Sequence, residues 1–289
     1  MHDPAPSHLA YELTAQPLPI TISLVDHLGP EPFFEQNDAS LPYSLAATSF
    51  DPMYYFSTNL QAELRSRGLP LTITREERGS PHLLLRDFHV YVQKTSPYTP
   101  IFFIVLMSGD LETEHGLRRI GAVVLRGGII HGGHLLEEPL SGAIQESASK
   151  IANALYGYRV SDASVDAQIG RLQGERTEDT YLQVYSLGFG NNPKAIDTVA
   201  KLASDDQEYM RAAAISSLGT LGAVAQLPLL ERIYASPKTS WQDRCLAAKS
   251  LGDLGTPEAD EILGRRIDLD VVGGNTHKEL LEKVLKLYR

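Results

Sequence analysis

Two kinds of hydrophobic periodicity divide the chain. In the N-terminal half, apolar and polar residues alternate over short stretches, which is the period of a β-strand with one buried face. From residue 177 onward, apolar residues instead recur every three or four positions, as in amphipathic helices. The pattern therefore predicts a two-layer α+β N-terminal domain followed by an all-α domain.

The N-terminal half is expected to follow the order β-α-β-β-β-β-α. Met53, Phe56, Leu60 and Leu64 lie at helical spacing, and a second helix carries Leu140 to Leu155 at steps of three or four. Both helices should cover the same face of the sheet, and the Phe33-Phe34 pair should fix the loop after the first strand. The predicted strands are 20–25, 69–74, 83–93, 101–111 and 120–130, and the predicted helices are 52–67 and 140–155.

The C-terminal third repeats itself at an interval of 33 residues. A period of this size is typical of stacked helix pairs, in which one pair alone cannot bury its apolar face. Three pairs are expected: 177–187 with 193–202, 208–218 with 224–235, and 241–251 with 257–267. The residues that recur are Arg211 and Arg244, Leu218 and Leu251, Gly219 and Gly252, and Gly222 and Gly255.

Short polar signals mark the ends of these helices. Asn192 and Thr256 each precede a proline and are predicted N-caps, and Pro228 is expected in a first turn. A capping box beginning at Thr276 should open a last helix that closes the stack. We expect three recurring glycines to end the first helices in left-handed turns: Gly188, Gly219 and Gly252.

The repeats resemble HEAT-like repeats of the short kind found in bilin-lyase-type and bacterial scaffold proteins. The resemblance implies a curved stack of helices, and such stacks offer an extended surface for a protein partner. The two recurring arginines are also expected to bond a carbonyl or an acid of a neighbouring repeat. The candidate partner-binding residues are Tyr185, Tyr209, Arg211, Trp241 and Arg244.

A second resemblance concerns the N-terminal half. The helix 54–68, the strand that runs from Pro81-His82-Leu83-Leu84-Leu85 to Val92, and the helix 143–156 resemble cell-envelope lipoproteins that are auxiliary to ABC-type lipid-transport systems. This resemblance implies a periplasmic or envelope-associated protein with a recruiting role. The alternative is a cytoplasmic protein.

We expect four segments along the chain. Eight of the 17 prolines lie in residues 1–52, which favours extended chain and turns there. The segments are a flexible N-terminal segment at 1–18, the α+β domain at 19–160, a polar linker at 161–176 and the repeat domain at 177–289.

Charge and hydropathy narrow the partner classes. The net charge is −10, and residues 1–180 carry 13 Lys and Arg against 22 Asp and Glu, a balance of −9. Nucleic-acid binding needs clustered basic residues, so no nucleic-acid partner is expected. No apolar run is long enough for a transmembrane helix, and the first residues lack the basic start and apolar core of a secretory signal.

Little in the sequence indicates catalysis, and no cofactor is expected. The single cysteine, Cys245, lies on an apolar helix face and is interpreted as a buried thiol. We therefore favour a non-enzymatic adaptor of a bacterial envelope assembly. One alternative is a metal-dependent hydrolase centred on His131, His134 and Glu138. The other is a carrier of a lipid or small hydrophobe between the two helices and the sheet.

Overall fold

The computed structural model describes residues 7, 9, 17–37, 50–76, 81–94, 101–128, 137–265 and 275–289. The chain forms two compact units. The N-terminal unit comprises Met1–His8 and Ala15–Leu155, and the repeat unit comprises Leu9–Thr14 and Tyr156–Arg289. None of the helices described is long and apolar enough to cross a membrane.

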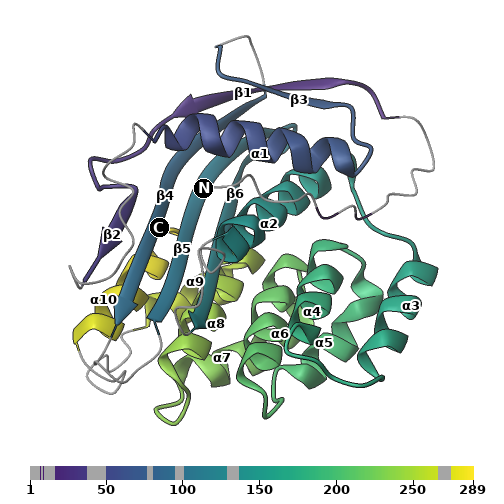
Figure 1. Ribbon diagram of the computed structural model, residues 1–289, viewed down its shortest axis with the longest axis vertical. Coiled ribbons are helices and arrows are strands. Elements are labelled where there is room, and N and C mark those ends of the chain that lie inside the picture. The colour runs from purple at the N-terminus through teal and green to yellow at the C-terminus, as the bar shows by residue number, and fades with distance from the viewer. Residues whose placement is uncertain are drawn as a thin grey trace. The chain divides into compact units, whose positions relative to one another are not determined.

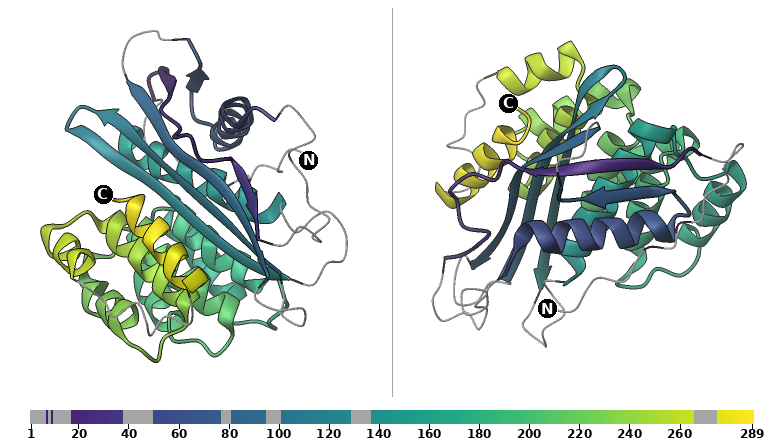
Figure 2. Two further views of the ribbon diagram at one scale, coloured as in Figure 1. Left: turned by 90° about the vertical axis from the view of Figure 1, so that its left-hand side faces the viewer. Right: turned by 90° about the horizontal axis from the view of Figure 1, so that it is seen from above.

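The N-terminal unit contains a mixed sheet in the order β3-β1-β4-β5-β6, with β2 also paired to β4 (Figure 1). β1 is parallel to β3 and β4, whereas β4, β5 and β6 are antiparallel. β5 and β6 lie side by side over their whole length (Figure 2). The elements are β1 (Ile20–Asp26), β2 (Phe34–Gln36), α1 (Pro52–Ser66), β3 (Leu71–Thr74), β4 (His82–Lys94), β5 (Ile101–Thr113), β6 (Gly116–Gly128) and α2 (Glu137–Tyr156).

Both helices cover one face of this sheet, as expected from the sequence. Phe88 on β4 and Met107 on β5 are opposite each other in the ladder, so their side chains point to the same face. The Phe56 ring of α1 lies 5.6 Å from the Phe88 ring, and Ser147 of α2 contacts the Met107 sulfur at 3.9 Å. This arrangement confirms the two-layer α+β fold.

The short strand β2 differs from the expected loop. Residues 34–36 pair in parallel with β4, beyond the point where β1 leaves it. Phe33 stacks on Phe50 with 4.5 Å between ring centroids and meets the edge of Phe88 at 5.0 Å. Phe33 thus fixes this segment to the core, as expected, while Phe34 begins the added strand.

Most of the N-terminal segment 1–18 lies outside the described residues, but Ser7 is held in place. Its backbone amide donates to Glu63 Oε2 at 2.8 Å, and its hydroxyl also donates to this carboxylate. Glu63 is 2% exposed and pairs with the buried Arg67 at 2.7 Å. Because an unpaired buried carboxylate is costly, these donors stabilise it, and Ser7 is an anchored point rather than part of a free tether.

The repeat unit consists of helices packed in pairs (Figure 1). The stretch predicted as a polar linker is largely helical, because Ser161 caps a helix that buries Val165 and Leu172. The elements are α3 (Asp162–Leu172), α4 (Thr180–Phe189), η2 (Pro193–Ala195), α5 (Ile196–Leu202), α6 (Glu208–Thr220), η3 (Val224–Gln226), α7 (Leu227–Ala235), α8 (Trp241–Leu254), α9 (Pro257–Gly264) and α10 (Asn275–Lys286).

Several predicted helix ends are confirmed. The Asn192 side chain accepts from the Lys194 amide, and the Thr256 side chain accepts from the Ala259 amide. Pro228 lies in the first turn of α7, where a missing amide hydrogen costs nothing. The last helix begins at Asn275, and the side chain of Thr276 lies outside the described residues.

The recurring glycines have a different role from the one expected. Gly188, Gly219 and Gly252 lie inside α4, α6 and α8, not in left-handed turns. The left-handed positions come three residues later, at Asn191, Gly222 and Gly255, with φ of 52°, 64° and 56°. A second 33-residue spacing, Gly222 to Gly255, therefore marks the turns.

The first set of glycines instead allows the helices to approach closely. A Cβ atom added at Gly188 would lie 2.5 Å from the Ser217 hydroxyl, and one at Gly219 would lie 2.6 Å from the Ser250 Cα. In addition, the Ser250 hydroxyl donates to the Ile215 carbonyl at 2.7 Å. Gly188 and Gly219 thus make room for the first helix of the next repeat, whose serine adds a hydrogen bond, whereas Gly252 makes room for the ring of Tyr288.

Gly219→Ala should lower the stability of the repeat unit. The new methyl group would overlap the Ser250 backbone, and overpacking of this kind costs about 1–3 kcal/mol, more than the gain in helix propensity. The measurement is the urea midpoint of the full chain, followed by circular dichroism at a helical wavelength.

Gly264→Ala is the matched control, because no atom lies within 4 Å of a Cβ there and φ is not positive. It should leave the midpoint unchanged or raise it slightly. Equal midpoints for the two variants would contradict the close-packing role of Gly219.

Candidate functional site

An aromatic cluster joins α4 and α6, the first helices of two successive repeats. Tyr181 of α4 meets Tyr209 of α6 at 5.4 Å between ring centroids and Tyr185 at 6.3 Å. Tyr181 is buried, whereas Tyr185 and Tyr209 are partly exposed. Tyr185 and Tyr209 are predicted partner-binding residues, and both contact the ring of Tyr181, a residue that the sequence analysis did not name.

Trp241 of α8 contacts a different aromatic ring. Its ring stacks on His277 of α10 with 4.6 Å between centroids and 10° between planes. The indole is partly exposed, so it combines a fixed position with an accessible edge. α10 also packs against α8, so the stack couples the closing helix to the last repeat.

Arg211 joins two repeats. Its Nε donates to Asp243 Oδ2 at 2.8 Å, and its Nη1 donates to the Asp205 carbonyl at 2.8 Å. The Asp243 side chain is 6% exposed, so the guanidinium neutralises a nearly buried charge. This contact is the structural role that the repeat pattern suggested for Arg211, although a quarter of its side chain remains exposed.

In this structure Arg244 is a buried residue, not a partner-binding residue. It is 1% exposed, and its Nε donates to the Ser236 carbonyl at 2.9 Å. The loop before α8 is thereby tied to the helix. The expected contact with a carbonyl is therefore present, but burial prevents Arg244 from contacting a partner.

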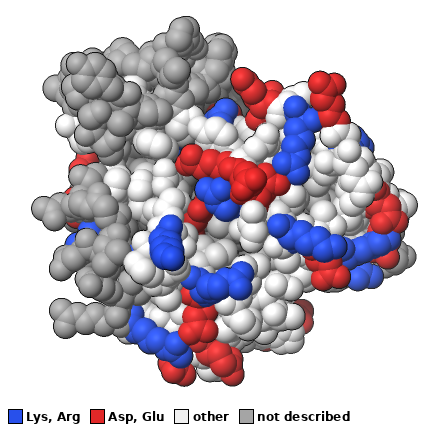
Figure 3. Space-filling model, turned by 90° about the horizontal axis from the view of Figure 1, so that it is seen from below, with Lys and Arg blue, Asp and Glu red and all other residues white. Residues whose placement is uncertain are grey.

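On the face shown in Figure 3, Lys and Arg alternate with Asp and Glu. Inter-repeat pairs include Arg176 with Asp205 at 2.9 Å and Arg265 with Glu231 at 2.5 Å. Exposed pairs of this type contribute little stability, so their main effect is to balance charge along the stack.

The predicted metal site is not assembled from described residues. His131 and His134 lie outside the described residues, and Glu138 pairs with Arg126, with 3.3 Å between Oε1 and Nε. Among the described residues, no three His, Cys, Asp or Glu side chains are grouped as metal ligands would be. The ion pair is a sufficient structural reason for the position of Glu138.

Ser108, Asp87 and His89 come together on the sheet. Ser108 lies inside β5, and its hydroxyl donates to Asp87 Oδ2 at 2.5 Å. His89 Nε2 lies 3.9 Å from Asp87 Oδ1. In a catalytic triad the hydroxyl bonds the imidazole, so this order of contacts does not activate Ser108.

The space proposed for a hydrophobic ligand is occupied by side chains. The residues between α1, α2 and the sheet are each 2% exposed or less, and their packing gives no support for a carrier of lipids. They include Phe56, Leu60, Leu64, Phe88, Val90, Val105, Ile144, Ala148 and Ile151.

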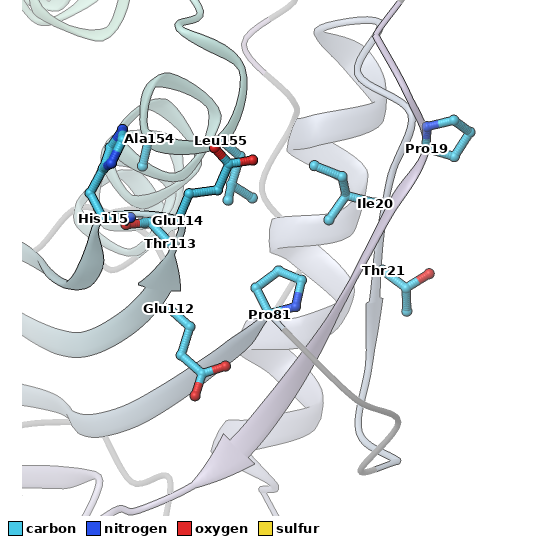
Figure 4. Close-up of a pocket in the computed structure, with 10 residues that line it drawn as sticks. All are labelled: Pro19, Ile20, Thr21, Pro81, Glu112, Thr113, Glu114, His115, Ala154 and Leu155. Atoms are coloured by element: carbon cyan, nitrogen blue, oxygen red, sulfur yellow. Dashed lines mark hydrogen bonds between the residues drawn. The ribbon is translucent and has the colours of Figure 1, made fainter.

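A cavity that the sequence analysis missed lies elsewhere in the N-terminal unit. It has a volume of about 640 Å³ and is drawn in Figure 4. Its wall collects residues from the start of β1, the start of β4, the β5–β6 turn and the end of α2. The lining residues are Pro19, Ile20, Thr21, Pro81, Glu112, Thr113, Glu114, His115, Ala154 and Leu155.

The family of HEAT repeats matches residues 174–243, which contain α4 to α7 and the start of α8. No curated protein matches the chain. The helical repeats are thus supported, and HEAT repeats typically serve as surfaces for protein interaction. The match does not reach the N-terminal unit, so it lends no support to the resemblance with envelope lipoproteins.

Cys245 should not react with thiol reagents in the folded protein. Burial raises the pKa of the Cys245 thiol to about 12, although nearby Arg244 acts to lower it. The thiol therefore stays protonated at about pH 8, and thiolate is the reactive form. Titration with a chromogenic disulfide should count no thiol in the native chain and one after denaturation.

Ala225→Cys supplies the positive control, because residue 225 is exposed. That variant should show one fast-reacting thiol under native conditions. Rapid labelling of Cys245 in the unaltered chain would contradict its assignment as a packed side chain.

Proposed function

We propose that this protein is a non-enzymatic adaptor whose repeat unit binds a partner protein. The observation that carries the proposal is the HEAT-repeat match over residues 174–243, together with the stacked helices α4, α6 and α8. Stacked repeats of this type present a continuous surface in which each repeat adds contact residues.

The aromatic edge is the part of the surface best suited to a partner. We define the aromatic edge as Tyr181, Leu182, Tyr185 and Tyr209. Leu182 is 40% exposed and lies one turn before Tyr185 on α4, so the two form a neighbouring apolar pair. Tyrosine is enriched among residues that dominate binding energy, because its large ring loses little side-chain entropy.

Trp241 is a second contact candidate, and the two arginines support the stack. Removing Arg211 would leave the nearly buried Asp243 carboxylate without its cation. A loss of binding in an Arg211 variant would therefore not distinguish contact from unfolding. The tyrosines of the aromatic edge carry no such charge and are better probes.

Tyr209→Ala should weaken partner binding about tenfold or more, the range for a central aromatic contact. The full chain is used as bait on extracts of the source cells, and bound proteins are quantified by mass spectrometry. The dissociation constant of the partner identified in this way is then measured with purified proteins.

Tyr54→Ala is the matched control, because Tyr54 is 62% exposed and lies on α1 of the N-terminal unit. It should retain the partner at wild-type affinity. The proposal fails if Tyr209→Ala, Tyr185→Ala and Trp241→Ala all fold and keep wild-type affinity for every protein captured.

We further propose that the adaptor works in a bacterial cell-envelope assembly. The proposal rests on the sequence of the N-terminal half, where the segments 54–68, 81–92 and 143–156 resemble auxiliary envelope lipoproteins. In that setting the repeat unit would bind one component while the N-terminal unit docks a second. The periplasm or the membrane surface is the expected location.

Fractionation of the source cells tests the location. The protein should appear in the periplasmic or membrane fraction when detected with an antibody, alongside marker proteins for each compartment. Recovery in the cytosolic fraction alone would refute the envelope assignment and leave the adaptor role to be judged by the binding experiment.

A further inference from the structure

The closing helix α10 lies on α8 in the place that the first helix of a further repeat would take. Near the start of α8, Trp241 stacks on His277 of α10. Near the end of α8, Gly252 leaves room for the ring of Tyr288, which follows α10. The two helices therefore run in the same direction.

The repeats themselves are fastened by an acid and a serine. Asp243 of α8 pairs with Arg211 of α6, with 2.8 Å between Oδ2 and Nε. Seven residues later, Ser250 packs on Gly219 and donates to the Ile215 carbonyl at 2.7 Å. Residues seven apart lie on one face of a helix, so α8 makes both contacts with the face that it turns toward α6. These contacts also show that α6 and α8 run in the same direction, as α8 and α10 do.

α10 reproduces neither of these fastenings. It contains no serine and no aspartate, and its two glutamates, Glu279 and Glu282, are exposed. Tyr288 holds the helix instead, because its ring covers Gly252 and its hydroxyl donates to Asp253 at 2.8 Å. The face of α8 that receives α10 therefore lacks the acid that α6 receives from α8.

Arg244 is the residue that this acid would neutralise. It lies 33 residues after Arg211 and is 1% exposed. Its Nε and Nη2 both donate to the Ser236 carbonyl, whereas its Nη1 has no hydrogen-bond partner among the described residues. Burial lowers the pKa of the guanidinium, and the groups that act to raise it are Tyr234 and Cys245, neither of them a carboxylate. A buried cation in this state is costly, so an acid that reached it would stabilise the stack.

We propose that the face of α8 bearing Arg244 and Gly252 binds an amphipathic helix of a partner protein in place of α10. The partner helix presents an aspartate or glutamate to Arg244 and, seven residues later, a serine or alanine to Gly252. This spacing is that of Asp243 and Ser250, so the partner helix extends the stack from α8 as α8 extends it from α6. α10 is then a regulatory helix that closes the stack until the partner helix displaces it.

Competition with α10 sets the affinity of this site. Arg244 is buried while α10 is in place, so a partner reaches it only after α10 leaves α8. The apparent dissociation constant is raised in proportion to the fraction of chains that are closed. The site lies on α8, apart from the aromatic edge on α4 and α6, and the proposal does not rest on binding at that edge.

Calorimetric titration of the full chain with a synthetic peptide provides the test. The peptide has the sequence of residues 239–255, which contain Asp243 and Ser250, with Cys245→Ala to prevent oxidation. Because this segment forms the helix that docks on α6, it should dock on the equivalent face of α8. A dissociation constant of about 0.1 mM or lower is expected for a single helix of this length.

Substitutions in the peptide test each contact without altering the protein. Asp243→Asn removes the charge offered to Arg244 and should weaken binding about tenfold or more. Ser250→Leu should also weaken binding about tenfold or more, because a leucine overpacks the close contact at Gly252.

Gln242→Ala is the matched control in the peptide. In the chain the Gln242 amide donates to Glu208 of α6 at 3.2 Å. The residue 33 positions after Glu208 is Trp241, which offers no acceptor, so this peptide should bind as tightly as the parent peptide.

Tyr288→Ala in the full chain should tighten binding of the parent peptide about fivefold or more. The reason is that α10 loses its ring contact with Gly252 and its bond to Asp253, which raises the fraction of open chains. Glu282→Gln changes an exposed residue of α10 and should leave the affinity unchanged. Circular dichroism checks that both variants fold, and the peptide series on the unaltered chain decides the outcome if Tyr288→Ala does not.

The proposal is overturned if the parent peptide does not bind at about 1 mM, well above the expected constant. Parent affinity of the Asp243→Asn or Ser250→Leu peptide would place the peptide elsewhere and overturn it as well. An unchanged affinity in folded Tyr288→Ala would show that α10 does not compete, with the same consequence.

Discussion

The spacing of the repeat helices is set by a glycine on one helix facing a serine on the next. Gly188 faces Ser217 and Gly219 faces Ser250, and a side chain at either glycine would collide with the neighbouring serine. The same interface contains Lys249, which is 0% exposed and donates to the Ser216 carbonyl at 2.9 Å. Lys249 also pairs with Asp253 of its own helix at 2.9 Å, so the buried charge is satisfied partly within α8 and partly by the neighbouring helix α6.

Much of the fold could be predicted from the sequence because its elements repeat a local period. The long strands and the helices α1 and α2 follow from alternation and from spacing of apolar residues over a dozen positions. The strand β2 was missed because three residues are too few to establish a period, and its pairing with β4 is non-local. The stretch that forms α3 was assigned to a linker because its apolar residues are sparse among polar ones.

Position in the repeat was easier to predict than physical role. A glycine that recurs can mark either a left-handed turn or a close contact, and both kinds occur here three residues apart. Recurrence likewise singled out Arg211 and Arg244 without indicating that only Arg211 is partly exposed. The cavity was beyond prediction, because its lining comes from four separated segments that only the tertiary fold brings together.

The stacking of Trp241 on His277 makes the chain its own optical probe. Trp241 is the single tryptophan, so all indole emission originates at the junction between α8 and α10. Detachment of the final helix would move that indole from contact with an imidazole into water. Fluorescence can therefore follow whether the C-terminal end of the stack is closed, in an unlabelled protein and at concentrations far below those needed for calorimetry.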